Sequence, residues 1–110
     1  MVIYKHNRSG KFYYFVTEAA LGADLAAWEE SQELAEKGFL TSSCCPAFVE
    51  YVSKFFPKLL DKVSHNPSPM VAMGEYIKAK EPESKVVFIG PCTAKKNEFR
   101  QESVRPYIDR

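Results

Sequence analysis

Three cysteines in two separate stretches are the residues of this sequence best suited to chemistry. Cys44 and Cys45 are adjacent in Thr41-Ser42-Ser43-Cys44-Cys45-Pro46, and Cys92 follows after a gap of 46 residues. Zinc fingers place their cysteines in pairs two to four residues apart, so this spacing does not indicate one. It is compatible with thiolates that hold a large iron–sulfur cluster from two loops, because thiolates are soft ligands for iron. The alternative is that these cysteines are small buried hydrophobic residues.

The composition excludes several classes of protein. The chain has 110 residues, of which 45% are hydrophobic, and a formal net charge of +1. We therefore expect a single domain, residues 1–110, with no charge that would gather nucleic acid or an anionic membrane. No apolar run approaches the roughly 18 residues of a membrane span, and the N-terminus does not resemble a signal peptide. An odd number of cysteines disfavours a disulfide framework and favours a reducing, cytoplasmic setting.

The first third of the chain predicts a hairpin and a helix. Residues 2–4 and 12–16 are rich in aromatic and β-branched side chains, and Asn7-Arg8-Ser9-Gly10 between them has the composition of a turn. A helix is expected over residues 23–37, and Gly38 is a typical stop signal. Glu30 and Glu33 lie three residues apart on this helix, so they project on neighbouring sides.

The remaining segments predict further helices and a strand. Pro46 suits the first position of an amphipathic helix that Pro57 must kink or break. Cys45 would then lie at a helix N-terminus, where free N–H groups favour the thiolate. Ser68-Pro69 opens a helix to about Lys80, and residues 94–101 predict a short helix. Residues 85–89 form a continuous apolar run typical of a buried parallel strand. The expected fold class is α/β, with helices packed on a small, mostly parallel sheet. The expected core includes several aromatic residues, namely Trp28, Phe48, Phe55 and Phe56.

Three ordered motifs resemble one known family. Thr41-Ser42-Ser43-Cys44-Cys45-Pro46 and Pro91-Cys92-Thr93-Ala94-Lys95-Lys96-Asn97-Glu98 are similar to the first two signature loops of the iron-only (FeFe) hydrogenase large subunit. Leu21-Gly22-Ala23-Asp24-Leu25 with Glu29-Glu30 resembles the stretch upstream of them, and Ser64 with Ser68-Pro69 resembles the segment between them. The similarity covers about residues 17–98 and implies part of the two-lobed catalytic domain of that family.

The resemblance implies a role for each motif residue. Cys45 and Cys92 would be two of the four thiolates that hold the [4Fe-4S] part of the H-cluster. Cys44 would pass protons to the amine bridge of the diiron subcluster, and Lys95 would hydrogen-bond a cyanide ligand on one iron. The acidic residues Glu30 and Glu33, together with Ser64, would carry protons from the surface. The family reaction is the reversible conversion of two protons and two electrons into dihydrogen.

Two positions depart from the catalytic members of this family. Gly90 stands where they carry a methionine packed against the diiron site, and Met70 stands where they commonly carry a glutamine. Both changes alter the surroundings that tune the cluster, and Gly90 is expected to leave a void or admit water. The pattern is similar to divergent, sensory branches of the family, so the parent could evolve, oxidise or sense hydrogen.

The resemblance also implies that more of the protein is needed. The third cysteine loop and an upstream segment that seats the cyanides are absent, so the chain reads as a fragment that is inactive alone and holds no complete cluster. Implied partners are the remainder of the hydrogenase chain, an electron carrier such as ferredoxin, and maturation proteins. Self-association through an uncovered apolar surface is also expected.

Non-catalytic or purely structural interpretations of the same residues remain as alternatives. The fold could belong to a non-catalytic relative that assembles iron–sulfur clusters, or to a structural α/β module with inert cysteines. Helix glutamates such as Glu30 and Glu33 are usually solvated, Lys95 could be a solvated lysine, and Ser64 could merely cap a helix. The two histidines, His6 and His65, are interpreted as surface residues.

Overall fold

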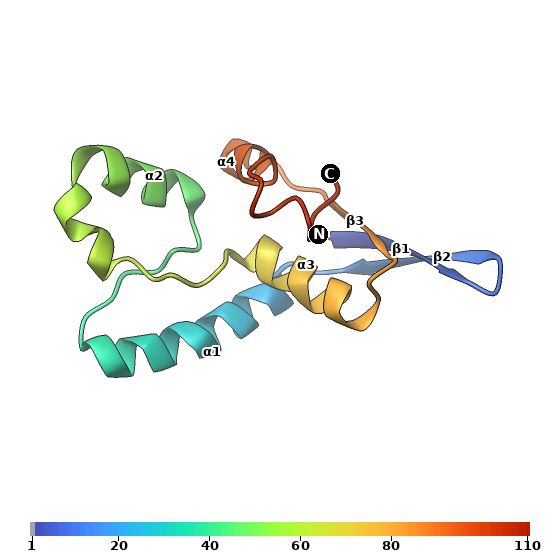
Figure 1. Cartoon of the computed structure of the whole chain (residues 1–110), viewed down its shortest axis with the longest axis horizontal. Coiled ribbons are helices and arrows are strands. Elements are labelled where there is room, and N and C mark those ends of the chain that lie inside the picture. The colour runs from blue at the N-terminus through green and yellow to red at the C-terminus, as the bar shows by residue number, and fades with distance from the viewer. Residues whose placement is uncertain (1) are drawn as a thin grey trace.

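The computed structural model describes the backbone of residues 2–110 and the side chains from Ser9 onward. The side chain of His6 therefore lies outside the described residues. The elements follow the order β1 (Val2–Arg8), β2 (Lys11–Thr17), α1 (Ala20–Lys37), α2 (Pro46–Phe55), the 3₁₀ helix η1 (Pro57–Lys62), α3 (Pro69–Lys80), β3 (Lys85–Phe88) and α4 (Thr93–Glu98). The molecule is elongated, at 52 × 27 × 21 Å. The hairpin and the α2–η1 unit occupy opposite ends, with α3 between them (Figure 1).

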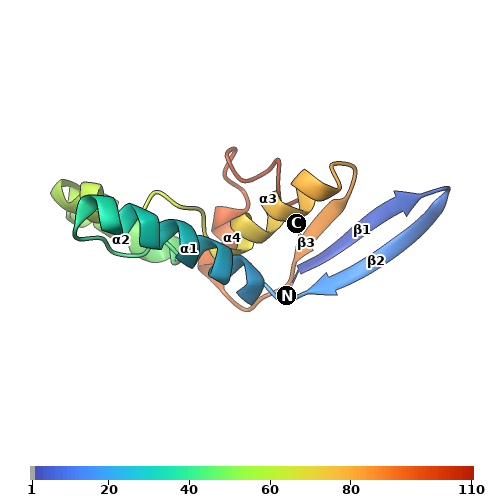
Figure 2. The same cartoon turned by 90° about the horizontal axis from the view of Figure 1, so that it is seen from below.

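The three strands form one antiparallel sheet in the order β2-β1-β3. The predicted hairpin is confirmed: Val2 pairs with Thr17, and the turn falls at Ser9 and Gly10, which both have positive φ. Such a pair of left-handed residues matches the twist of the flanking strands. The hairpin extends away from the helices (Figure 2).

The predicted combination of helices and strands is confirmed, but the prediction of a mostly parallel sheet is wrong. β3 pairs with β1 in the antiparallel sense, with Lys85 opposite Lys5. A continuous apolar run indicates that a strand is buried, but it does not determine whether the neighbouring strand runs parallel or antiparallel to it. The burial is also less complete than expected, because Val86 alone among the four residues of β3 is fully buried.

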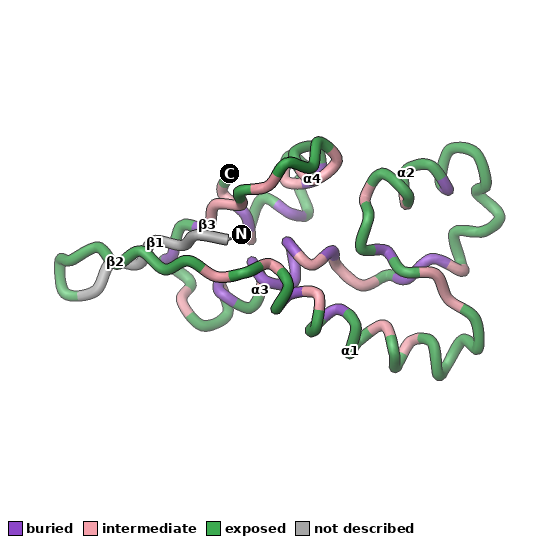
Figure 3. The backbone as a smooth tube through the Cα atoms, turned by 180° about the vertical axis from the view of Figure 1, so that it is seen from behind, coloured by how far each residue is buried: buried purple, intermediate pink, exposed green. Residues whose placement is uncertain are grey.

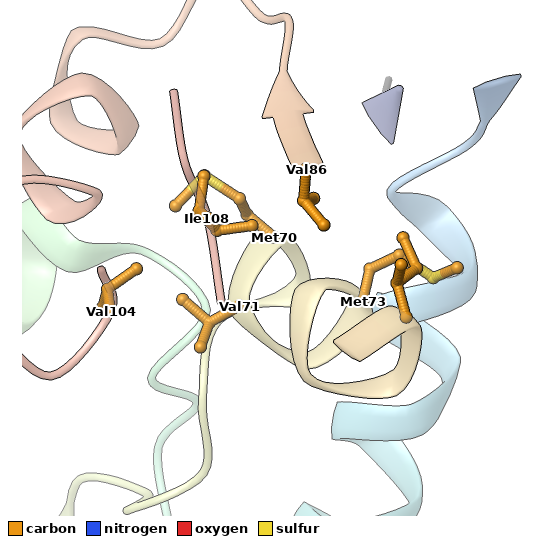
Figure 4. Close-up of a cluster of buried hydrophobic side chains, with 7 residues drawn as sticks. Met70, Val71, Met73, Val86, Val104 and Ile108 are labelled. Carbon is orange, nitrogen blue, oxygen red and sulfur yellow. The ribbon is translucent and has the colours of Figure 1, made fainter. Parts of the chain in front are cut away.

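The core is centred on α3. This helix buries residues on several sides because α1, the sheet and the C-terminal segment all surround it (Figure 3). Its side chains pack with one residue of β3 and two of the C-terminal segment (Figure 4); the cluster comprises Met70, Val71, Met73, Ile77, Val86, Val104 and Ile108. Burial of these apolar side chains is the main stabilisation available to the chain.

The closest packing between helices occurs where α1 meets the start of α3. Gly22 and Ala26 are the buried residues of α1. A Cβ atom at Gly22 would lie 2.0 Å from the backbone oxygen of Pro69 and 3.1 Å from Cβ of Met73. Small residues therefore let α1 approach α3 closely, and this contact fixes the helix that carries Glu30 and Glu33.

The aromatic residues expected in the core are exposed instead, so that prediction is wrong. Trp28 is 70% exposed and Phe55 is 66% exposed, and Phe48 and Phe56 are exposed as well. Pro57 breaks the amphipathic helix as predicted, so α2 ends at Phe55 and a 3₁₀ helix follows. The periodicity correctly identified an apolar face, of which Val52 is buried, whereas the aromatic side chains of this face stay exposed. Among the described residues, no helix is both long and apolar enough to span a membrane.

Candidate metal and proton-transfer site

Both cysteines expected to be cluster ligands directly precede helices. Cys45 is the residue before α2, with Pro46 in the first turn, and its carbonyl accepts a hydrogen bond from the N–H of Val49 at 3.1 Å. Cys92 directly precedes α4 and accepts from the N–H of Lys96 at 3.3 Å. All three cysteines are free and exposed. The interpretation of these cysteines as buried hydrophobic residues is therefore wrong, and their thiols are available to an external group.

Lys95 joins the two cysteine loops. Its ammonium donates hydrogen bonds to the carbonyl oxygen of Cys44 at 3.0 Å and to Oε2 of Glu98 at 3.0 Å. The side chains of Lys95 and Glu98 are only 13% and 11% exposed, so this pair is largely shielded from water. The interpretation of Lys95 as a solvated lysine is thus wrong. The contact brings together loops that are 51 residues apart in sequence.

The described residues do not form a closed metal site. They contain no group of three or more histidine, cysteine, aspartate or glutamate side chains placed to hold a metal ion. Two exposed thiols on adjoining loops instead fit a cluster whose other ligands come from elsewhere, because iron–sulfur clusters are commonly held by four thiolates.

Glu30 of α1 reaches the loop that contains Cys44. Its Oε1 accepts hydrogen bonds from Oγ of Ser42 at 2.9 Å and from the N–H of Ser43 at 3.1 Å. The hydroxyl of Ser42 also accepts from the N–H of Cys44 at 3.3 Å. Glu30 is therefore engaged by the loop beside Cys44.

Glu33 lies one turn further along α1 and is enclosed by donors. Its Oε2 accepts from Oγ of Ser64 at 3.0 Å, from the N–H of His65 at 3.2 Å and from the amide of Asn66 at 3.1 Å. Its Oε1 accepts from Nζ of Lys37 at 2.6 Å and lies 2.9 Å from Nδ1 of His65. The His65 side chain, followed by Lys37, lowers the pKa of Glu33 to about 2 despite the opposing effect of desolvation.

Asn66 connects the surroundings of the two glutamates. Its backbone carbonyl accepts a hydrogen bond from Oγ of Ser43 at 2.6 Å, and its side-chain amide donates to Glu33 and to Ser64. The structure thus brings together the three residues predicted for proton transfer, Glu30, Glu33 and Ser64, in one network of hydrogen bonds that extends to the backbone of Cys44.

Sequence reasoning missed five members of this network: Lys37, Ser42, Ser43, His65 and Asn66. Lys37 is four residues after Glu33 on the same helix, so the usual spacing of helical ion pairs could have identified it. Ser43, His65 and Asn66 join the network through contacts between distant segments. No local pattern signals such contacts. His65 is exposed as expected, but it is not an isolated surface residue.

The two departures from the family pattern have different structural outcomes. A Cβ atom at Gly90 would lie 2.8 Å from two ring atoms of Phe88. The predicted void or water at Gly90 is therefore wrong, because the Phe88 ring occupies that space. Met70 is 1% exposed and belongs to the hydrophobic core.

Comparison with known proteins identifies the family of this chain. Residues 6–110 match the family described as the iron only hydrogenase large subunit, C-terminal domain. The chain belongs to this family. It is 34% identical over 91 residues to iron hydrogenase 1 of Clostridium pasteurianum, an alignment that covers 70% of the chain and 16% of that protein.

A second iron hydrogenase relative gives the same result. The periplasmic Fe hydrogenase large subunit of Nitratidesulfovibrio vulgaris is 33% identical over 102 residues, covering 78% of the chain and 23% of that subunit. The chain therefore spans less than a quarter of the length of either relative. No solved structure gave a significant match.

Proposed function

We propose that this iron hydrogenase chain supplies two ligands to the H-cluster and carries protons between that cluster and the surface. The parent protein would interconvert protons, electrons and dihydrogen, or sense dihydrogen at the same site. The observation that supports this function best is the network that connects Glu33 and Ser64 through Asn66 and Ser43 to Glu30 beside Cys44. A domain that served only as a scaffold would not need a polar series that leads to the backbone of a cysteine whose thiol is exposed.

Cys45 and Cys92 are the proposed ligands to the [4Fe-4S] part of the cluster. Their thiols are exposed, and the loops that present them are joined by the hydrogen bond from Lys95 to Cys44. The remaining two thiolates would come from another part of the hydrogenase protein. When bound, the H-cluster would supply the electrons and the diiron site at which dihydrogen is formed or cleaved.

Cys44 is the proposed proton carrier nearest the cluster. The Ser42 hydroxyl bonds both to the N–H of Cys44 and to Glu30, so these groups stay close as a proton is passed between them. A thiol and a carboxyl group on neighbouring segments, with a hydroxyl-bearing residue between them, are suited to such transfer. Ser64 and Glu33 would continue the series outward.

Lys95 would contribute both position and charge. Its ammonium is largely shielded from water and holds the carbonyl of Cys44. A shielded ammonium is also a strong donor toward an anionic cyanide ligand, which is its proposed role when the cluster is present. Glu98 balances its charge when no such ligand is bound.

Variants at the two adjacent cysteines test this proposal. In the hydrogenase protein that contains this chain, anaerobic reconstitution followed by iron and acid-labile sulfide analysis should show cluster loss in Cys45→Ser and retention in Cys44→Ser. After maturation, Cys44→Ser should keep the infrared bands of CO and cyanide but lose most hydrogen turnover. The pair is matched, because both substitutions replace sulfur by oxygen at neighbouring positions.

Two outcomes would support the rival functions instead. Iron and sulfide without infrared bands in the matured wild-type protein would favour a role in cluster assembly. Equal iron content in Cys45→Ser and wild type would indicate that the cysteine is not a ligand and would contradict the proposal.

A further inference from the structure

We propose that His65 is the residue through which this chain exchanges protons with solvent, as the outermost member of the network that contains Glu33 and Ser64. The inference rests on the proposed function, because it extends the proposed proton route to the surface. It is carried by the position of the imidazole, which is in contact with the enclosed carboxylate and also exposed to water.

The geometry singles out His65 among the groups around Glu33. Its side chain is 73% exposed, whereas that of Glu33 is only 15% exposed. The N–H of His65 donates to Oε2 of Glu33, and its ring nitrogen Nδ1 lies 2.9 Å from Oε1 of the same carboxylate. Two contacts therefore hold the residue against Glu33 while most of its side chain remains in solvent.

The ring nitrogen Nδ1 also has a second neighbour. Nζ of Lys37 lies 3.1 Å from it. A neutral imidazole whose Nδ1 is bare accepts a hydrogen bond from Lys37, and a protonated imidazole donates from Nδ1 to Glu33 instead. His65 can thus occupy either of two hydrogen-bonding states that differ by one proton. Histidine is the side chain whose ordinary charge change falls near neutral pH.

The proposed transfer moves one proton from solvent through the His65 ring to Glu33. In the neutral tautomer that carries its proton on Nδ1, the ring donates to Oε1 of Glu33 and its exposed nitrogen Nε2 is bare. A proton from water or buffer binds Nε2, and the Nδ1–H bond then breaks as an O–H bond forms at Oε1 of Glu33. The imidazole becomes neutral and Nδ1 accepts from Lys37, while the uncharged carboxyl group can donate toward Ser64. Because Lys37 favours the carboxylate, Glu33 holds the proton only transiently.

Three further carboxylates line the same groove as His65. The groove of about 990 Å³ that includes His65 is also lined by Glu50 of α2, Glu75 of α3 and Glu98 of α4. Glu50 is paired with Lys54 and Glu98 with Lys95, so neither adds an uncompensated negative charge to the groove. Lys37 of α1 is the cation in direct contact with the ring.

Nuclear magnetic resonance of this chain tests the inference without a cluster. We expect the side-chain carboxyl carbon of Glu33 to show a small second titration step at the pH where the His65 ring signals titrate. In His65→Gln, this step should disappear and the pKa of Glu33 should rise from about 2 toward 4.5, because His65 contributes most to its lowering. The matched control His6→Gln, which alters the other histidine, should change neither property.

A second variant keeps the test decisive if His65→Gln disturbs folding. Lys37→Gln removes the competing donor and retains His65, so the second step at Glu33 should become larger. Absence of that step in both the wild type and Lys37→Gln would overturn the inference, as would its persistence in a folded His65→Gln variant.

The matured hydrogenase gives an independent measurement. His65→Gln should slow hydrogen turnover, by up to roughly 100-fold if the exchange step becomes limiting, and added imidazole should restore much of the loss. A merely structural role for His65 would not respond to imidazole. Unchanged turnover in His65→Gln would overturn the inference. A matured wild type that neither turns over dihydrogen nor responds to it would contradict the proposed function, while the titration of Glu33 would still decide the role of His65.

Discussion

Replacement of Gly22 by alanine should separate the two helices that position the proposed proton route. The added Cβ atom would lie 2.0 Å from the backbone oxygen of Pro69 and 3.1 Å from Cβ of Met73. Carbon and carbonyl oxygen atoms rarely approach within about 3.3 Å, so α1 must move from α3 by roughly 1 Å. Neither obstacle can rotate away, because one is a backbone atom and the other is directly attached to the backbone.

The expected cost follows from two opposing effects. Overpacking of a close contact costs about 1–3 kcal/mol, and an immovable backbone atom places Gly22→Ala toward the upper end. Alanine regains up to about 1 kcal/mol over glycine in a helix. The free energy of unfolding should therefore fall by about 1–2 kcal/mol. The shift should also loosen the contacts of Glu33 with the segment that contains Ser64 and His65.

Urea unfolding followed by circular dichroism provides the measurement. The unfolding midpoint should decrease with little change in slope, because the surface exposed on unfolding is nearly the same. Gly74→Ala is a useful comparison: its nearest obstacle at 2.6 Å is the terminal Cδ1 of Ile108, which can move, so the loss should be smaller. A Gly22→Ala protein that is as stable as wild type or more stable would refute the close packing of α1 on α3.

Three further substitutions test other contacts. The pKa of Glu33 is about 2 in the folded chain and ordinarily 4.5. The ionised carboxylate therefore stabilises the folded state above about pH 4.5, and this stabilisation is lost as the pH falls toward 2. Glu33→Gln should reduce the difference between the urea unfolding midpoints at about pH 3 and about pH 7. Burial opposes ionisation of Asp109, but hydrogen bonds from the Val86 N–H and from two lysines outweigh burial and lower the pKa of Asp109. Asp109→Asn should lower the free energy of unfolding by about 1–2 kcal/mol at pH 7 and speed hydrogen exchange of the Val86 amide. Lys95→Met leaves the buried carboxylate of Glu98 without its cation and should lower the melting temperature. The double variant Lys95→Met/Glu98→Gln should recover part of that loss. Additive effects of the two substitutions on the melting temperature would contradict the pairing of Lys95 with Glu98.

The elements could be predicted because their signals are local. Ser9-Gly10 suits a tight turn, and both residues adopt the left-handed conformation there. Gly38 ends α1 with φ of 73°, and its N–H bonds to the carbonyl of Leu34. Pro57 breaks the helical pattern and Pro69 begins α3. Proline restricts its own backbone and glycine permits a positive φ that other residues avoid, so in each case a single residue carries the signal.

The relations between elements could not be predicted in the same way. The direction of β3 depends on which strand lies beside it, and that strand, β1, is about 80 residues away along the chain. The exposure of Trp28 and Phe55 depends on which elements cover them, although both are hydrophobic by type. The motif residues Glu30, Glu33 and Ser64 were predicted through their resemblance to a family. By contrast, Asn66 and His65 required the fold, because their contacts with Glu33 join segments more than 30 residues apart.

Met70 and Gly90, the two departures from the family pattern, both involve the packing of the core. Met70 and the Phe88 side chain both belong to the packing around α3 and β3, Met70 within the core cluster and Phe88 against it. The Phe88 ring also fills the space beside Gly90, two residues before Cys92. A larger side chain at Gly90 would therefore displace a ring that supports the core. The surroundings of the Cys92 loop and the packing of the core are thus coupled through Phe88. Because of this coupling, we expect Gly90→Met alone to lower stability, and we expect Phe88→Ala in the same chain to recover part of that loss by making room for the methionine.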